Sequence, residues 1–154
     1  MAKKHGLEVS LDLASYNIVE ENRAFLHTII EKYVDIVFAN EEEATTFAQT
    51  SVDESLQYIA ERTNIAVVKI GSKGSLIMKN GQKEIIPAYP ANCIDTTGAG
   101  DLYASGFLSA YAKEYDLEQC GKTGSYLASQ IVKEIGTKFA DEKWNRLQEN
   151  IKKL

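Results

Sequence analysis

The sequence predicts an α/β fold: a three-layer α/β/α sheet with a β-hairpin, followed by long C-terminal helices. Strand-like apolar runs alternate with helix-like segments through about the first seventy residues, which is typical of parallel strands with helices on both faces. An Asn-Gly pair between two β-prone runs predicts the hairpin. A helical pattern then fills the chain after Gly100. With 154 residues, of which 44% are hydrophobic and 25% charged, the chain is predicted to form one domain over residues 1–154.

The first segments have clear periodicities. Residues 7–11 alternate between apolar and polar side chains, which is the strand period. Residues 19–32 carry apolar side chains at helical spacing, and two glutamates lie in the first turn, where the helix dipole favours anions. Residues 34–38 form a short apolar run, which predicts a buried strand.

Two helices and a third strand are predicted next. Asn40 precedes three glutamates and a helical pattern that extends to about residue 50. Ser51 and Glu54 have the spacing of a capping box, in which each residue bonds the backbone of the other, and this predicts a second helix to about residue 62. The β-rich run 65–70 predicts a buried strand.

The second half begins with turns and ends in helices. Residues 71–74 form a predicted turn, and residues 75–79 and 82–86 form a hairpin around Asn80-Gly81. A loop leads to residue 95, and helices are predicted over 102–113, 117–135 and 141–153, with Gly136 as the C-cap of the middle one.

Composition excludes several classes of function. A net charge of −5 leaves no cationic surface for a nucleic-acid backbone. We find neither the apolar run of a membrane span nor that of a secretory signal, and expect a cytoplasmic protein without membrane or nucleic-acid partners. Cys93 and Cys120 lack the spacing of a zinc site and are interpreted as small apolar residues in a reducing compartment.

The segment 95–101, DTTGAGD, is the motif that points to chemistry. Gly98 and Gly100 have no Cβ, so a ligand can approach their backbone closely. The first amides of the helix that follows lack internal partners, and a phosphate is the natural occupant of such a terminus. Asp101 would repel an anion that merely binds there. Its carboxylate makes sense if it takes a proton from a hydroxyl that attacks phosphorus.

Simpler interpretations of the same glycines stay open. The segment has the features of an ordinary Gly-rich loop whose aspartate suits the helix dipole. A dinucleotide-binding GxGxxG motif would need glycine at Tyr103, which disfavours a nicotinamide-dependent oxidoreductase. A P-loop ending at residues 121–123 would need glycine at Asp116.

The segment 95–108, DTTGAGDLYASGFL, resembles the C-terminal signature of the ribokinase-like (PfkB) carbohydrate and nucleoside kinases. Residues 40–43 resemble the N-x-x-E motif of this family, 69–74 its nucleotide-side strand and turn, and 124–129 its adenine-flanking helix. These segments follow one another in the family's order. Residues 124–136 and Trp144 favour the adenosine-kinase-like branch.

The resemblance implies roles for individual residues. Asp101 would be the catalytic base, and the amides of Gly98, Ala99 and Gly100 would form the anion hole for the transferring phosphoryl group. The cofactors implied are ATP, Mg²⁺ and, in some members, K⁺. The remaining residues implied are Lys69, Gly71 and Gly74 at the ATP phosphates and ribose, Ser125 and Ala128 at the adenine, Asn40 and Glu43 at Mg²⁺, and Asp95 and Thr97 at a monovalent cation.

The chain is considerably shorter than members of this family, which have an N-terminal half with a lid and most acceptor-binding residues. We therefore expect an ATP-binding, catalytic half that phosphorylates an alcohol of a sugar or nucleoside only when completed, and little activity of this chain alone. An uncovered strand edge predicts self-association or association with the missing half. The alternative is a non-catalytic nucleotide-binding or oligomerisation module.

Overall fold

The computed structural model describes residues 2–154, which divide into two compact units. The first unit contains the chain up to Ile70 together with Leu76–Glu84. The second contains Gly71–Ser75 and Ile85–Leu154. Among residues 2–154, no helix is both long enough and apolar enough to cross a bilayer.

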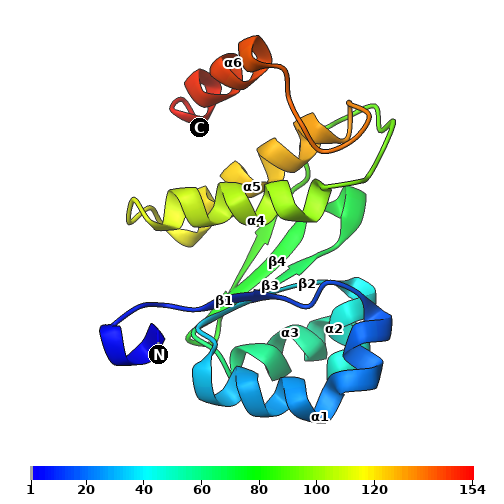
Figure 1. The fold of residues 1–154 in the computed structure, drawn as a ribbon, viewed down its shortest axis with the longest axis vertical. Coiled ribbons are helices and arrows are strands. Elements are labelled where there is room, and N and C mark those ends of the chain that lie inside the picture. The colour runs from blue at the N-terminus through cyan, green and yellow to red at the C-terminus, as the bar shows by residue number, and fades with distance from the viewer. Residues whose placement is uncertain (1) are drawn as a thin grey trace. The chain divides into compact units, whose positions relative to one another are not determined.

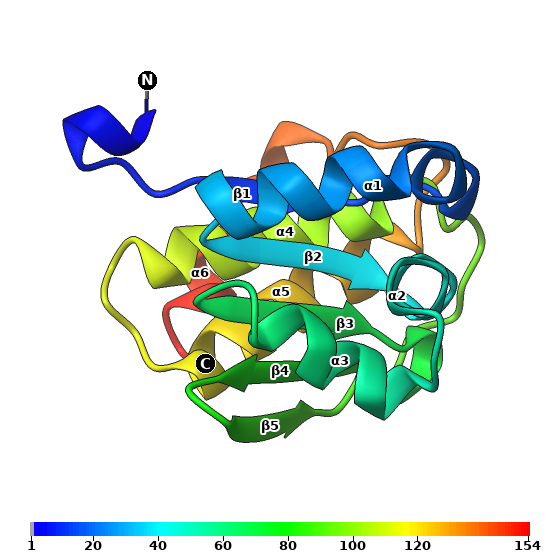
Figure 2. The same cartoon turned by 90° about the horizontal axis from the view of Figure 1, so that it is seen from below.

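The strands form a five-stranded mixed sheet in the order β1-β2-β3-β4-β5 (Figure 2). Parallel pairing of the first three strands places Leu11 beside Val37 and Val37 beside Ala66. Carboxyl ends of parallel strands meet at one edge of a sheet, so side chains that end these three strands are brought to a common edge. The strands are β1 (Ser10–Asp12), β2 (Ile36–Asn40), β3 (Ile65–Lys69), β4 (Ser75–Lys79) and β5 (Gln82–Ile86).

The hairpin predicted from Asn80-Gly81 is confirmed. Strands β4 and β5 are joined by these two residues, whose φ angles are 51° and 76°. Two consecutive positive φ values are characteristic of the type I′ turn, whose twist matches that of a two-stranded antiparallel ribbon.

Three helices of the first unit lie on one face of β1–β3 (Figure 1). They are α1 (Tyr16–Tyr33), α2 (Glu41–Ala48) and α3 (Val52–Ala60). Ser51 and Glu54 form the predicted capping box at the start of α3. The core between sheet and helices is aliphatic, with one buried phenylalanine from α2; its members include Val19, Ile30, Val37, Phe47, Leu56, Ile59, Ala66 and Val68.

The second unit is helical, with α4 (Ala99–Tyr111), α5 (Leu117–Ile131) and α6 (Asp141–Ile151). Helices α4 and α5 approach closely because glycines face each other across the contact. A Cβ on Gly106 would lie 2.9 Å from the Thr123 carbonyl oxygen, and one on Gly124 would lie 2.7 Å from that of Tyr103. Short 3₁₀ helices occur at Ala2–His5 and Gly71–Lys73.

Several boundaries differ from those that the sequence predicts. Strand β2 is Ile36–Asn40 rather than 34–38, and helix α4 is Ala99–Tyr111 rather than 102–113. The first strand is Ser10–Asp12 rather than 7–11. Helix α5 ends at Ile131, so Gly136 is not its C-cap. The Val132 carbonyl accepts hydrogen bonds from the backbone amides of Ile94 and Asp95. The loop before α4 therefore supplies donors to a carbonyl group that has no partner within α5.

Candidate functional site

The carboxyl edge of β1–β3 gathers polar side chains in the first unit. Asn40 ends β2 and is in register with Lys69, which ends β3. The Lys69 Nζ atom donates to the Asp12 Oδ2 atom at 2.8 Å, so the ammonium is bound to the carboxylate that ends β1. Asp12 has no role in the sequence prediction, although its place after an alternating strand could have indicated this edge.

Asn40 and Glu43 satisfy each other at the start of α2. The Glu43 carboxylate accepts a hydrogen bond from the backbone N–H of Asn40 at 2.8 Å and another from the side-chain Nδ2 of Asn40 at 2.7 Å. In return, the Asn40 Oδ1 atom accepts the backbone N–H of Glu43 at 2.8 Å. Burial raises the pKa of Glu43, and the Asn40 bond and the Lys69 charge oppose the shift. The carboxylate and amide are oxygen donors of the kind that suits Mg²⁺ and its waters. Among residues 2–154, no three acidic, histidine or cysteine side chains cluster as a ready metal site.

The turn 71–74 belongs to the second unit and is pressed against the end of β5. Gly74 has a φ of 108°, and a Cβ there would lie 1.9 Å from the Ile86 carbonyl oxygen. No other residue fits this position without moving the backbone. Gly71 also has a positive φ, 58°, but it is exposed and open to solvent.

The start of α4 is a half-buried helix terminus. Its N-cap, Gly98, has a φ of 78° and makes no side-chain capping bond. The Ala99 N–H donates to the Thr96 carbonyl at 3.1 Å, whereas the amides of Gly100 and Asp101 bond no other residue within 2–154. The Asp101 side chain is exposed in the first turn. The start of α4 therefore presents free amides and an accessible carboxylate, whereas the Ala99 amide is already bonded within the turn.

The Asp95 carboxylate stabilises the loop before α4 by accepting three hydrogen bonds. Its Oδ1 atom accepts the Thr97 N–H at 2.9 Å and the Thr97 hydroxyl at 2.7 Å, and its Oδ2 atom accepts the Gly136 N–H at 3.0 Å. These hydrogen bonds lower the pKa of Asp95 to about 2, and the bond from the Thr97 hydroxyl makes the largest contribution. The carboxylate therefore stays ionised and joins the segments before α4 and after α5.

The two residues expected at an adenine lie on α5. Ser125 is buried, and its hydroxyl donates to the Pro87 carbonyl at 3.0 Å. Ala128 is half-buried one turn further along. Between them Tyr126 packs edge-on against Tyr89, with ring centroids 5.4 Å apart. Ser125 thus links α5 to the segment that Gly74 contacts.

The predicted residues therefore fall into two sets. The first unit holds Asn40, Glu43 and Lys69. The second unit brings together the glycine turn, the DTTGAGD loop and the α5 segment, joined by contacts at Gly74, Asp95 and Ser125. Sequence reasoning missed Ser75 and Tyr103, whose buried hydroxyl groups lie 2.6 Å apart, and no sequence signal pairs them.

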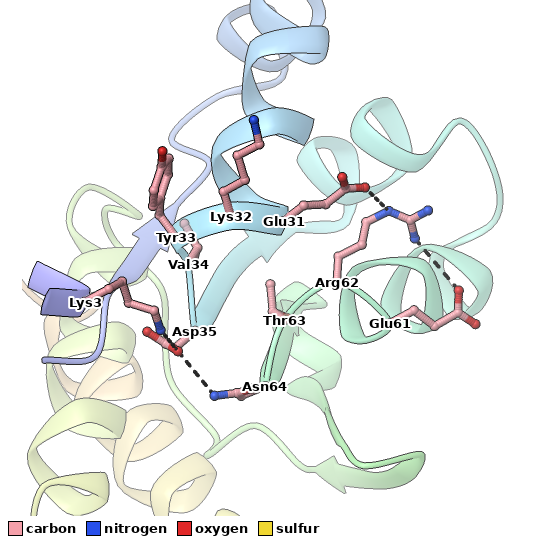
Figure 3. A pocket seen from close by; sticks show the side chains of 10 residues that line it. All are labelled: Lys3, Glu31, Lys32, Tyr33, Val34, Asp35, Glu61, Arg62, Thr63 and Asn64. Atoms are coloured by element: carbon pink, nitrogen blue, oxygen red, sulfur yellow. Dashed lines mark hydrogen bonds and ion pairs between the residues drawn. The ribbon is translucent and has the colours of Figure 1, made fainter. Parts of the chain in front are cut away.

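A shallow pocket of about 340 Å³ lies away from all of these residues, in the first unit (Figure 3). Asp35 and Asn64 line it and immediately precede β2 and β3, so it is at the amino ends of the strands, opposite to Asn40 and Lys69. Most of its charges are paired: Lys3 with Asp35, and Arg62 with Glu31 and Glu61. We assign no ligand to this pocket.

Comparison with known proteins gives consistent matches. The model of the pfkB family carbohydrate kinases matches residues 2–144. A nucleoside kinase from Methanocaldococcus jannaschii is 37% identical over 141 residues, which are 89% of this chain and 45% of that protein. Two crystal structures have a TM-score of 0.90 over 97% of this chain. One is a probable sugar kinase from Rhizobium etli CFN 42, which is 35% identical, and the match covers 47% of that protein's chain. The other is an adenosine kinase from Sinorhizobium meliloti, which is 31% identical, and the match covers 46% of its chain.

These neighbours confirm the predicted α/β, ribokinase-like fold class. The chain spans about half the length of the relatives named above. The match to nearly the whole chain, together with the DTTGAGD loop that opens α4, establishes that this chain belongs to the pfkB family of carbohydrate kinases.

Proposed function

We propose that this chain is the ATP-binding and catalytic part of a kinase that transfers the γ-phosphoryl group of ATP to an alcohol of a nucleoside or a sugar. The observation that carries the proposal is the exposed Asp101 carboxylate beside the free amides at the start of α4. Relatives named nucleoside kinase, adenosine kinase and sugar kinase support the acceptor class. Because the chain spans about half of these relatives, the activity proposed is that of the whole protein.

In the proposed reaction, the hydroxyl oxygen of the nucleoside or sugar forms a bond to the γ-phosphorus of ATP. Asp101 takes the proton of that hydroxyl at the same time. The bond from phosphorus to the bridging oxygen breaks, and ADP leaves. The amides of Gly98 and Gly100, together with that of Asp101, would stabilise the charge on the transferring group. The Ala99 amide would contribute only if it exchanged its bond to Thr96 for one to the phosphate.

The remaining residues would hold the nucleotide and its metal. The Gly71–Gly74 turn would border the phosphates, and the α5 segment around Ser125 would border the adenine. Asn40 and Glu43 would hold Mg²⁺ through its waters, and the ion would neutralise phosphate charge. Asp95 and Thr97 remain the residues proposed for a monovalent cation.

Calorimetry with Mg-ATP tests nucleotide binding by the chain itself. The Asp101→Asn variant should bind ATP at least as tightly as the wild type, because it removes a negative charge beside the phosphates. The matched control is Asp141→Asn, which makes the same change in the exposed first turn of α6 and should leave the affinity unchanged. Failure of the wild type to bind ATP, or loss of binding in Asp101→Asn alone, would refute the proposal.

Turnover is tested in the protein that contains this chain, with Mg-ATP and a nucleoside or sugar. Asp101→Asn should lower kcat by about 10²–10⁴-fold, the usual contribution of a general base. Asp141→Asn should retain wild-type turnover. ATP binding without acceptor-dependent ADP formation in the wild type would instead favour a nucleotide-binding module.

A further inference from the structure

Two buried hydroxyl groups of the second unit bond each other and have no role in the chemistry above. The Ser75 Oγ and Tyr103 OH atoms lie 2.6 Å apart, and the two residues are 0% and 4% exposed. Burial raises the pKa of Tyr103 above its ordinary value, although the Ser75 bond opposes this. The phenol therefore stays protonated, and the two groups share one hydrogen bond out of contact with water.

The bond joins two segments that lie 28 residues apart in the chain. Ser75 directly follows Gly74, whose backbone is pressed against Ile86. Tyr103 lies on the first turns of α4, two residues beyond Asp101, and its ring packs against Gly124 of α5. The pair thus connects the glycine turn directly to the start of the helix that carries Asp101.

A purely structural contact would not need these hydroxyl groups. Alanine and phenylalanine at the two positions would keep the β-carbon and the ring, and replacing both members of a buried polar pair by apolar groups is often nearly neutral for stability. What the hydrogen bond adds is a fixed distance and direction between the segments, because it is short and shielded from water.

We propose that Ser75 and Tyr103 are a positioning pair that holds the Gly71–Gly74 turn and the first turn of α4 in the arrangement that binds the ATP phosphates. This rests on the proposed function, since both segments are assigned to the phosphates there. Neither side chain is required to touch the nucleotide. The pair acts through the backbone amides of the segments that it joins.

The test compares the affinities of the chain for Mg-ATP and for AMP in Tyr103→Phe, Ser75→Ala and the double variant. AMP lacks the β- and γ-phosphates but carries the same adenosine. Each single variant should weaken ATP binding by about tenfold, the effect of one net hydrogen bond, and leave AMP binding within about twofold. The double variant should bind ATP no more weakly than either single one, because both changes remove one interaction.

The matched control is Tyr111→Phe, which removes a phenolic hydroxyl at the other end of α4 and should leave both affinities unchanged. The thermal midpoint of every variant is recorded, and binding is measured well below it. Wild-type ATP affinity in Tyr103→Phe and Ser75→Ala would overturn the positioning role and leave the proposed function intact. Equal losses for ATP and AMP, or a similar loss in the control, would also overturn it by indicating a general structural effect. Failure of the wild type to bind ATP would refute the proposed function, and this inference with it.

Discussion

Replacement of Gly74 by alanine is expected to destabilise the second unit strongly. At a φ of 108°, a residue with a Cβ is strained, and such strain costs about 1–3 kcal/mol. The new Cβ would lie 1.9 Å from the Ile86 carbonyl oxygen and 2.7 Å from the Ala88 nitrogen, both of them backbone atoms. Moving a packed backbone costs about 1–3 kcal/mol more. We expect a total loss of about 2–6 kcal/mol, against about 5–15 kcal/mol for the stability of a typical protein.

Urea unfolding measures this loss. The chain has one tryptophan, Trp144, which lies in α6 of the same unit, so its fluorescence reports on the unfolding of that unit. With an m-value of about 2 kcal/mol/M, the midpoint should fall by about 1–3 M. Gly71→Ala is the control, because Gly71 also has a positive φ but no atom within 4 Å of its Cβ position. Equal losses in the two variants would refute the close approach of the turn to β5.

Two pH effects follow from shifted pKa values. Hydrogen bonds from Thr97 and Gly136 lower the pKa of Asp95 from 3.8 to about 2. The contribution of Asp95 to stability is therefore present above pH 3.8 and is lost as the pH falls towards 2. In Asp95→Asn, the free energy of unfolding measured across this range should lose that part of its pH dependence. Burial, followed by the charges of Arg23 and Arg62, lowers the pKa of His27 from 6.5, so protonation favours the unfolded chain and stability should decline as the pH falls below 6.5. His27→Gln should remove that decline, and an unchanged slope would show that other groups cause it.

Much of the secondary structure could be predicted from sequence because its determinants are local. The capping box of Ser51 and Glu54 spans three residues, and Asn80-Gly81 forms its hairpin turn through its own positive φ values. The start of α4 at the glycines of DTTGAGD is local in the same sense. In each case the interacting atoms lie within a few bonds along the chain, so the residue types largely decide the conformation.

The hydrogen bonds of the candidate site residues could not be predicted, because their partners lie far along the chain. Lys69 bonds Asp12, 57 residues away, and Asp95 bonds the Gly136 amide, 41 residues away. At the end of α5 the amides of Ile94 and Asp95 bond the Val132 carbonyl, a contact that helix periodicity does not contain.

The amino-acid sequence by itself determined the order of strands and helices along the chain. It also placed Asp101 directly after two glycines, Gly98 and Gly100, at the start of a helix. Only the tertiary structure decided that Lys69 bonds Asp12 and that Ser75 bonds Tyr103. The physical reason is that local backbone preferences act between neighbours, whereas a hydrogen bond between distant residues forms only where the packing of many other side chains brings its two atoms together.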